Sequence, residues 1–559
     1  MLHLSLLLLS FIGYFLALFI YKKGKGTALY PAIVVSTIVV IGFLAGLINQ
    51  MEAVYMLTFG IGLLLLVGLS FAIVFRKFSL PDCSLTSILP LLLFCLGFFT
   101  LHLIFNGRFL FSYDDFSHWG QAAQVISINQ RLPIPEDGLI FTSYPVGSSL
   151  FIAYGAVVLG CSADTYLFMQ ALLLWAFYLS MLSATNKPWG QLIIAFLIML
   201  FMQYNITLES LSVDNLLSAA AIAGFMICVD SDKSLRNMFA ELALVLSALT
   251  LIKNSGFFLA IILLGYMLFL CRKNKNFKRE MIWLLLPFAV IILWNVHVST
   301  TFTNASKHAV SITYYHSILA DKRRAGIRTT LGIILPLLFK PSTNHALLLI
   351  PGYLLSLILL YKRNRLAQTK SIFLFAGVLL IVYEIGVMAM YVLSMPTEEV
   401  IYQNGQDYYR YNGTVIAILA AILIYLLCNL LPEKLYFKPI KNAIVALACC
   451  SLICLNVIFV LSLELFLIEP VETRRETSST AAKLMQISKD NAFPTDASFV
   501  ILYDMPDTAG YHYFVSGFYL KTYDIIHCYD QATATKEYTE NPEKYYINLN
   551  TGELFTPKE

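Results

Sequence analysis

The sequence predicts an all-α polytopic membrane protein with about 13–14 transmembrane helices and a small α+β unit at its C-terminus. Hydrophobic residues make up 58% of the 559 positions and charged residues only 13%, and the mean hydropathy is +0.73; a water-soluble globule does not have this composition. Apolar runs recur along the first two thirds and more of the chain, each near the length of about 20 residues that crosses a bilayer. After Glu469 the hydropathy falls.

Each long apolar run is taken as a helix. The predicted helices are 2–21, 28–49, 53–75, 84–105, 164–183, 190–207, 214–229, 238–252, 256–270, 282–299, 345–361, 371–393, 413–430 and 443–467. The first has no basic segment before it and no small-residue cleavage site, so we expect a retained helix rather than a signal peptide. The run 148–160 is short for a crossing, and we expect a juxtamembrane or re-entrant helix there.

Basic residues fall in alternate loops, which predicts that those loops are cytoplasmic. They are Lys22, Lys23, Lys25, Arg76, Lys77, Lys187, Lys233, Arg236, the run 272–279, Lys362, Arg363, Arg365, Lys434, Lys438 and Lys441. The polar candidate residues then lie on the extracytoplasmic side. The Lys-rich loops and the lack of a eukaryotic retention signal favour a bacterial inner or plasma membrane, with the active site facing outside.

The topology divides the chain into six parts. They are N-terminal transmembrane helices (1–105), an external catalytic loop with juxtamembrane helices (106–163), a transmembrane core (164–299), an external flap loop (300–344), C-terminal transmembrane helices (345–469) and a small soluble extracytoplasmic domain (470–559). In the last part, 497–503 and 511–526 have the β-branched and aromatic bias of strands, and 477–489 is typical of a helix.

The external loop opens with two adjacent carboxylates, Asp114 and Asp115, followed by His118 and Trp119. A carboxylate at the membrane surface would act as a general base toward a hydroxyl, or would bind a divalent cation. The alternative is structural, because Asp115 would also cap a helix that begins at Phe116.

Three further charged positions lie at predicted external helix ends. Asp214, with Glu209 nearby, precedes an apolar run and is either a site residue or a helix cap. Lys253 lies where the chain must reverse between two short apolar runs, and Arg410 lies in QDYYRYNG. Both cations suit a lipid-linked phosphate; the alternatives are a snorkelling Lys253 and an interfacial anchor at Arg410.

The sequence lacks the motifs of several well-known enzyme and transporter classes. The sequence has no Walker A loop, no GxGxxG after a strand, no HExxH and no GxSxG, so nucleotide-driven transport is not indicated. The ten Cys form no metal-type cluster. No nucleic-acid partner is expected.

The motifs together resemble the GT-C glycosyltransferases, in the branch of protein O-mannosyltransferase-like and aminoarabinose-transferase-like membrane enzymes. They are the acidic YDDFSHWG, then YPVGSSLF from Tyr144, SVDNLLS around Asp214 and LIKNSGF with Lys253 and Gly256. Their order and sidedness agree with the predicted topology. The family's usual Pro-Pro pair is Pro145-Val146 here.

The resemblance implies transfer of one sugar from a polyprenyl-phosphate donor to an extracytoplasmic acceptor, which is a glycolipid, a cell-wall polymer or a protein. Asp114 or Asp115 would be the base, and inversion at the anomeric carbon is expected. Lys253 and Arg410 would bind the donor phosphate, His118 and Tyr144 would orient the base or sugar, and Asp214 would hold an acceptor or a metal. Mg²⁺ or Mn²⁺ at Asp114 and Asp214 is the cofactor to consider, and membrane lipids are the surroundings of the donor tail.

Two other functions remain open at this stage. A lipid-linked sugar flippase or transporter would need charged residues along its helices, of which Glu384 and Glu241 are examples. An O-antigen polymerase or ligase would rely on external Arg and His, as in the segment 307–324 of the flap loop. That loop, with its cationic run 322–324, would cover a phosphorylated substrate or be an ordinary solvated loop.

Overall fold

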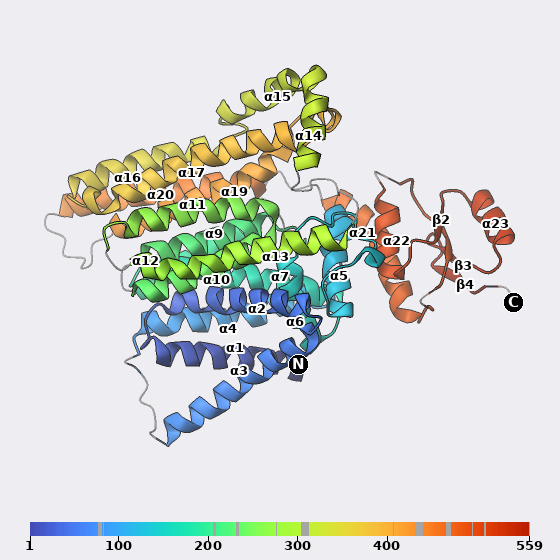
Figure 1. Ribbon diagram of the computed structural model, residues 1–559, viewed down its shortest axis with the longest axis horizontal. Helices are drawn as coiled ribbons and strands as arrows, with labels where there is room; N and C mark the ends of the chain where they lie inside the picture. The colour runs from blue at the N-terminus through green and yellow to red at the C-terminus, as the bar shows by residue number, and fades with distance from the viewer. Residues whose placement is uncertain are drawn as a thin grey trace.

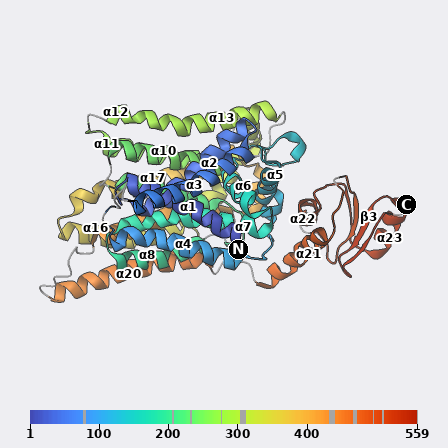
Figure 2. The same cartoon turned by 90° about the horizontal axis from the view of Figure 1, so that it is seen from below.

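The computed structural model describes residues 1–75, 81, 83–204, 208–230, 234–274, 277–302, 312–405, 407–430, 440–465, 471–494, 496–507 and 510–557. Long helices lie side by side in a bundle, and a small α/β unit projects from one end of it (Figures 1 and 2). Among the described residues, 11 helical segments are long and apolar enough to cross a membrane. The predicted all-α polytopic fold with a small C-terminal sheet is confirmed, although the described residues contain 11 such segments where about 13–14 were predicted.

Each predicted apolar run coincides with a helix. These helices are α1 (Leu2–Tyr21), α2 (Tyr30–Leu47), α3 (Met51–Val74), α4 (Leu85–Phe105), α7 (Ala163–Tyr178), α8 (Pro188–Gln203), α9 (Asp214–Val229), α10 (Leu235–Ile252), α11 (Asn254–Cys271), α13 (Leu285–Thr301), α16 (Ile350–Lys362), α17 (Leu366–Leu393), α19 (Asp407–Leu430) and α20 (Ile440–Leu465). The shorter helices are α5 (Gly120–Asn129), α6 (Gly147–Leu159), α12 (Phe277–Glu280), α14 (Ile312–Asp321), α15 (Ile327–Phe339) and α18 (Thr397–Gln403). With 13 residues, α6 is short for a crossing, as expected.

The centre of the bundle is α9, which packs against α7, α10, α11 and α19. Its sequence is rich in small residues, SAAAIAG over 218–224. Small side chains allow helix backbones to approach closely where lipid offers no hydrophobic driving force. Nearly every residue of α9 is buried, so its two ends are fixed by neighbours on all sides.

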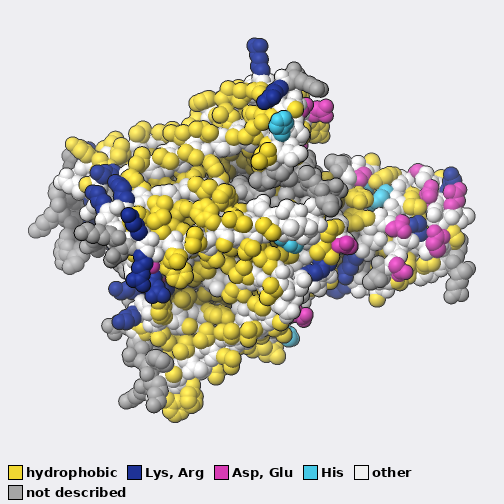
Figure 3. All heavy atoms as spheres, in the orientation of Figure 1, with side chains coloured by type: hydrophobic (Ala, Val, Ile, Leu, Met, Phe, Trp, Pro, Cys, Tyr) yellow, Lys and Arg dark blue, Asp and Glu magenta, His cyan; other side chains and the backbone are white. Residues whose placement is uncertain are grey.

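One end of the bundle is basic. A row of Lys and Arg side chains follows the edge away from the C-terminal unit (Figure 3). Inside this end, Lys22 after α1 pairs with Glu241 of α10, and both side chains are largely buried. The predicted intramembrane Glu241 therefore has a charged partner, which offsets the cost of its burial.

The C-terminal unit is a four-stranded sheet with helices. After α21 (Val471–Asp490), the strands are β1 (Phe499–Leu502), β2 (Ile525–Cys528), β3 (Tyr545–Asn548) and β4 (Glu553–Phe555), and α22 (Tyr511–Leu520) and α23 (Gln531–Glu540) connect them. The strand order is β2-β1-β3-β4, in which β1 is parallel to β2 and β3, and β4 is antiparallel.

The strand predicted across 511–526 is wrong for most of its length, because 511–520 is the helix α22 and only 525–528 is a strand. Parallel neighbours need a crossover connection, and a helix supplies it between β1 and β2. Most of the aromatic residues that suggested a strand lie on the buried face of this helix, namely Tyr511, Phe518 and Tyr519, beside Val515.

The C-terminal unit rests on the external loop that carries the acidic motif. Gln121 Nε2 of α5 donates to Tyr523 Oη at 2.6 Å, and Gln124 Nε2 donates to the Phe518 carbonyl at 3.1 Å. Phe116 is fully buried and its ring contacts those of Phe518 and Tyr519. The loop is therefore held between the bundle and the C-terminal unit.

The predicted flap loop forms α14 and α15, which both contact α17 and lie beside one of its ends (Figure 1). Residues 303–311 lie outside the described residues, and so does the first part of the 307–324 segment. Lys322 is buried, and its Nζ donates to Thr330 Oγ1 at 2.7 Å. The Lys322 charge thus serves the flap's own fold rather than an open site.

Candidate functional site

Four charged side chains from separate parts of the chain meet at the end of the bundle beside the C-terminal unit. Asp114 precedes the short turn 115–119, Asp214 is the first residue of α9, Lys253 lies between α10 and α11, and Arg410 lies in the first turn of α19. We call these four residues the ion-pair cluster. The sequence predicted each of them as a site residue.

Arg410 is the centre of the ion-pair cluster. Its Nε lies 2.7 Å from Asp214 Oδ2, and its Nη1 lies 2.8 Å from Asp114 Oδ2. Lys253 Nζ lies 2.7 Å from Asp214 Oδ1. Asp214 thus holds both cations, and the two carboxylates balance the two positive charges.

Exposure within the cluster is uneven. The side chain of Asp214 is 2% exposed, whereas those of Asp114 and Arg410 are 25% and 30% exposed. Burial raises the pKa of Asp114, but Arg410 and His118 more than offset this, so the net pKa is below its usual value. Asp114 and Arg410 form the open side of the cluster, and Asp214 forms its buried base.

Asp115 has a different environment from its neighbour. It is fully buried, and its Oδ1 accepts from the Leu211 backbone N–H at 2.7 Å and from Ser210 Oγ at 3.1 Å. Burial raises the pKa of Asp115 to about 7, although these hydrogen bonds act in the opposite direction. Its carboxyl group ties the acidic loop to the segment that leads into α9, and no helix-capping bond forms at Asp115 or Asp214.

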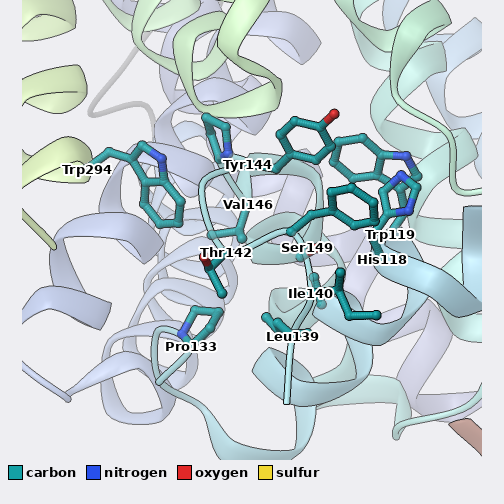
Figure 4. A pocket seen from close by; sticks show the side chains of 13 residues that line it. His118, Trp119, Pro133, Leu139, Ile140, Thr142, Tyr144, Val146, Ser149 and Trp294 are labelled. Atoms are coloured by element: carbon teal, nitrogen blue, oxygen red, sulfur yellow. The ribbon is translucent and has the colours of Figure 1, made fainter. Parts of the chain in front are cut away.

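An aromatic pocket adjoins the ion-pair cluster (Figure 4). Its cavity volume is small, about 20 Å³, and its lining includes His118, Trp119, Phe141, Tyr144 and Trp294. The Trp119 and Tyr144 rings stack at 5.5 Å, and Phe141 stacks on Tyr144 at 5.4 Å. Such a surface suits the flat, partly apolar face of a sugar or an isoprenoid.

His118 links the aromatic pocket to the ion-pair cluster. Its Nδ1 lies 2.7 Å from Ser117 Oγ. Burial lowers the pKa of His118 to about 4, against the opposing charge of Asp114, so the imidazole is neutral at pH 7. A neutral ring beside Asp114 offers one hydrogen-bond donor and one acceptor without adding charge.

Glu209 does not join the cluster. It lies at the rim, where its carboxylate is 3.9 Å from Arg108 and both side chains are exposed. Exposed pairs of this kind contribute little to stability. The structure therefore places Glu209 apart from the other predicted site residues.

Two contacts of the cluster were not predicted. Ser212 Oγ lies 3.5 Å from Arg410 Nη2 and 3.4 Å from Asp214 Oδ2, and Lys253 Nζ lies 5.4 Å from the centre of the Tyr411 ring. Both residues are within two positions of a predicted residue, Ser212 before Asp214 and Tyr411 after Arg410. Their closeness in the sequence to predicted site residues was the one signal that could have identified them.

A polar network holds the start of α19, and hence Arg410, against α17. Glu384 of α17 accepts from Asn344 Nδ2 at 2.9 Å and from Tyr408 Oη at 3.1 Å. Asn412 Nδ2 donates to Asn344 Oδ1 at 2.9 Å. The predicted intramembrane Glu384 is thus fully engaged in positioning a helix.

The predicted metal ligands do not fit a divalent cation as they stand. Within the described ranges, no three His, Cys, Asp or Glu side chains converge on one point. Asp114 and Asp214 are both bound to Arg410, which would have to leave before a cation could bridge them. We therefore route no chemical step through a metal.

No family model and no curated protein matches the chain. Among solved structures, the chain is similar to ArnT from Cupriavidus metallidurans bound to undecaprenyl phosphate, with 12% identity, a TM-score of 0.41, and coverage of 84% of this chain and 91% of that chain. The apo state of the same protein gives 12% identity, a TM-score of 0.38, and coverage of 82% and 89%. At this level the likeness says nothing about substrate or chemistry, which have to be inferred from the side chains.

Proposed function

We propose that this chain is a GT-C type membrane glycosyltransferase that moves a sugar from a polyprenyl-phosphate donor to an extracytoplasmic acceptor. The observation that carries the proposal is the ion-pair cluster, in which Arg410 and Lys253 meet two carboxylates beside an aromatic pocket. The Lys and Arg loops at the other end of the bundle support an outward-facing site in a bacterial cell membrane.

The donor phosphate binds at the open side of Arg410. The guanidinium is planar and always charged, and its Nη groups suit a phosphate. Asp114 is the partner that a phosphate displaces, because it is more exposed than Asp214. Asp214 and Lys253 stay paired below and hold Arg410 in place, so the cation is fixed before the substrate arrives.

Displacement of Asp114 prepares the base. With Arg410 engaged by the phosphate, the interaction that lowers the pKa of Asp114 weakens, and its pKa rises. Asp114 then takes the proton of the acceptor hydroxyl as the acceptor oxygen bonds to the anomeric carbon. The bond from that carbon to the phosphate oxygen breaks, and the charge that develops on the leaving phosphate is stabilised by Arg410. A single displacement of this kind inverts the anomeric carbon.

The aromatic pocket is where the transferred sugar or the first acceptor unit would stack once its lining side chains move apart, because the cavity itself is only about 20 Å³. Trp119 Nε1 is buried and has no hydrogen-bond partner among the described residues, so an indole N–H remains to be satisfied by a ligand. In the pocket lining, neutral His118 supplies a polar edge, and the stacked Tyr144 supplies a flat ring face.

Substitution of Asp114 by Asn tests the proposal. In membranes at matched expression, with a polyprenyl-phosphate sugar as donor, we expect Asp114→Asn to lower kcat by roughly 10²- to 10⁴-fold, the usual contribution of a general base. The exposed Asp496 of the C-terminal unit provides a matched control, and Asp496→Asn should transfer sugar like the wild type. Full activity of Asp114→Asn would refute the mechanism.

The two alternatives gain no specific support. Glu384 and Glu241, the charged residues that a transporter would use, bond to Asn344 and Tyr408 and to Lys22, respectively. In the flap loop, Lys322 is bound to Thr330. A polymerase or ligase reading would be favoured only if the Asp114 substitution left activity intact.

A further inference from the structure

A row of exposed and half-buried aromatic rings runs from the acidic loop onto the C-terminal unit. We call Tyr113, Phe514, Tyr513, His527 and Tyr529 the tyrosine strip. Ring centres lie 5.4 Å apart for Tyr113 and Phe514, 5.3 Å for Phe514 and Tyr513, and 6.1 Å for Tyr513 and His527. Tyr529 continues the strip through the buried ring of Tyr503, 5.7 Å from Tyr529 and 5.5 Å from His527.

The strip is open to solvent. Tyr113, Tyr513 and Tyr529 are 41%, 42% and 44% exposed. Its inner end is Tyr113, which directly precedes Asp114 in the sequence, and burial together with the charges of Asp114 and Asp507 raises the pKa of Tyr113. The strip thus begins at the residue that directly precedes Asp114 of the ion-pair cluster.

Unsatisfied polar atoms lie beneath the strip. His527 Nδ1 lies 3.0 Å from Tyr503 Oη, but its Nε2 is buried and has no partner among the described residues. The Nδ1 atom of His512, a residue only 2% exposed whose ring stacks on Tyr503 at 4.1 Å, is unpartnered too. Buried ring nitrogens without partners are uncommon in folded proteins and indicate a missing polar ligand or water.

We propose that the tyrosine strip is the docking site of a carbohydrate acceptor, whose sugar units stack on the exposed rings of Tyr113, Tyr513 and Tyr529 while its reactive end reaches Asp114. This inference rests on the proposed function and deepens it by naming the acceptor class. The electron-rich ring faces attract the C–H faces of sugars, and the exposed Tyr hydroxyls and Asp507 can pair with sugar hydroxyls.

The surroundings favour a carbohydrate over a lipid or a protein. The C-terminal unit projects beyond the bundle, and its surface carries scattered acidic side chains, whereas the middle of the bundle is mostly hydrophobic on the face shown (Figure 3). A lipid tail would not settle there. A stable protein interface buries about 800 Å² on each partner around an apolar centre, but this strip is one ring wide.

Direct binding tests the strip without sugar transfer. Fluorescently labelled oligosaccharides released from bacterial envelope polysaccharides are titrated against the full-length chain in detergent. Tyr513→Ala and Tyr529→Ala should each weaken binding by roughly 3- to 10-fold, the effect of losing one stacked ring. Phe555 is an aromatic residue of the same unit that is 47% exposed and lies outside the strip, so Phe555→Ala is the matched control and should bind like the wild type. Asp114→Asn should also bind normally.

Kinetics distinguish the strip from the catalytic step. In the transfer assay, the Tyr513→Ala and Tyr529→Ala variants should raise KM for an oligosaccharide acceptor and leave kcat unchanged, whereas Asp114→Asn lowers kcat. The proposal is overturned if wild-type chain binds no oligosaccharide, if the two Tyr variants bind as well as Phe555→Ala, or if lipid vesicles or peptides compete through the strip instead. Strip-dependent oligosaccharide binding without any sugar transfer would support the strip and refute the proposed function.

Discussion

At the scale of single residues, two adjacent carboxylates have opposite roles because their surroundings differ. Asp114 faces Arg410 and remains partly exposed, whereas Asp115 is fully buried and accepts hydrogen bonds from Ser210 and Leu211. A carboxyl group with no access to solvent or substrate cannot take a proton from an acceptor. The choice between the two is open from the sequence, and in the mechanism that we propose the base is Asp114.

Asp115 makes stability depend on pH. Its pKa rises from 3.8 to about 7 on folding, with burial as the main cause, so the folded chain keeps a proton that the unfolded chain releases. Its contribution to stability is complete below its unfolded pKa and is lost as pH rises through the folded pKa. Asn at this position does not titrate. We therefore expect the Tm of the wild type, relative to that of Asp115→Asn, to fall as the pH rises from about 4 to about 7. Above that pH the difference in Tm should stay constant. A constant difference over this range would contradict the prediction.

The members of the ion-pair cluster were predictable, but their pairing was not. Polar residues at the ends of apolar runs identified Asp114, Asp214, Lys253 and Arg410. Arg410 and Asp214 are 196 positions apart and Lys253 and Asp214 are 39 apart, and hydropathy carries no information on which helix ends meet. The sequence predicted that Lys253 and Arg410 would be free to bind a phosphate. In the structure, both cations are already paired with carboxylates.

At the scale of elements, the reversal between α10 and α11 places Lys253. Lys253 has an extended backbone between two helices, and the tip is enclosed by close backbone contacts. A Cβ on Gly256 would lie 2.0 Å from the Leu249 carbonyl oxygen, and one on Gly147 would lie 2.7 Å from that of Leu251. Only residues without a side chain fit on either side of this tip, which explains glycine in both YPVG and LIKNSG.

Gly256→Ala should therefore lower transfer activity without preventing α11 from forming. The added methyl group must push the tip outward and carry Lys253 away from Asp214, and a displacement of about 1 Å at a site can cost roughly 10²-fold in rate. Gly265, in the same helix, has nothing within 4 Å of its Cβ position. Gly265→Ala is thus the control, and it should keep full transfer activity. Equal activity of the two variants, at equal amounts in the membrane, would show that the tip does not control Lys253.

The helices and strands were predicted best in the segments that lie in the membrane. Every apolar run became a helix because an unpaired backbone group is costly in hydrocarbon, which leaves a helix as the one local solution for a single run. Water places no such demand on the C-terminal unit. There the aromatic sequence YHYFVSGFYL suggested a strand, although its buried positions repeat with helical spacing, and the need for a crossover between parallel strands decided the outcome.

At the scale of the whole molecule, all the proposed chemistry lies at one end and most basic loops lie at the other. Two native cysteines mark the two ends. Cys161, between α6 and α7, is exposed and lies 3.6 Å from the Ser127 carbonyl oxygen in the external loop. Cys83 is also exposed and precedes α4, where Ser84 lines a cavity shared with Lys22 and Lys25 of the basic end.

Labelling of these cysteines tests the orientation of the entire protein. A membrane-impermeant maleimide added to intact cells should modify Cys161 and spare Cys83, and permeabilised cells should show both, because a charged reagent does not cross the bilayer. Cys161→Ser and Cys83→Ser assign each labelled product. Modification of Cys83 in intact cells would place the basic loops outside and Asp114 in the cytoplasm. A lipid-linked donor on the outer surface could then not reach Arg410, since the ion-pair cluster and Cys161 occupy the same end of the bundle.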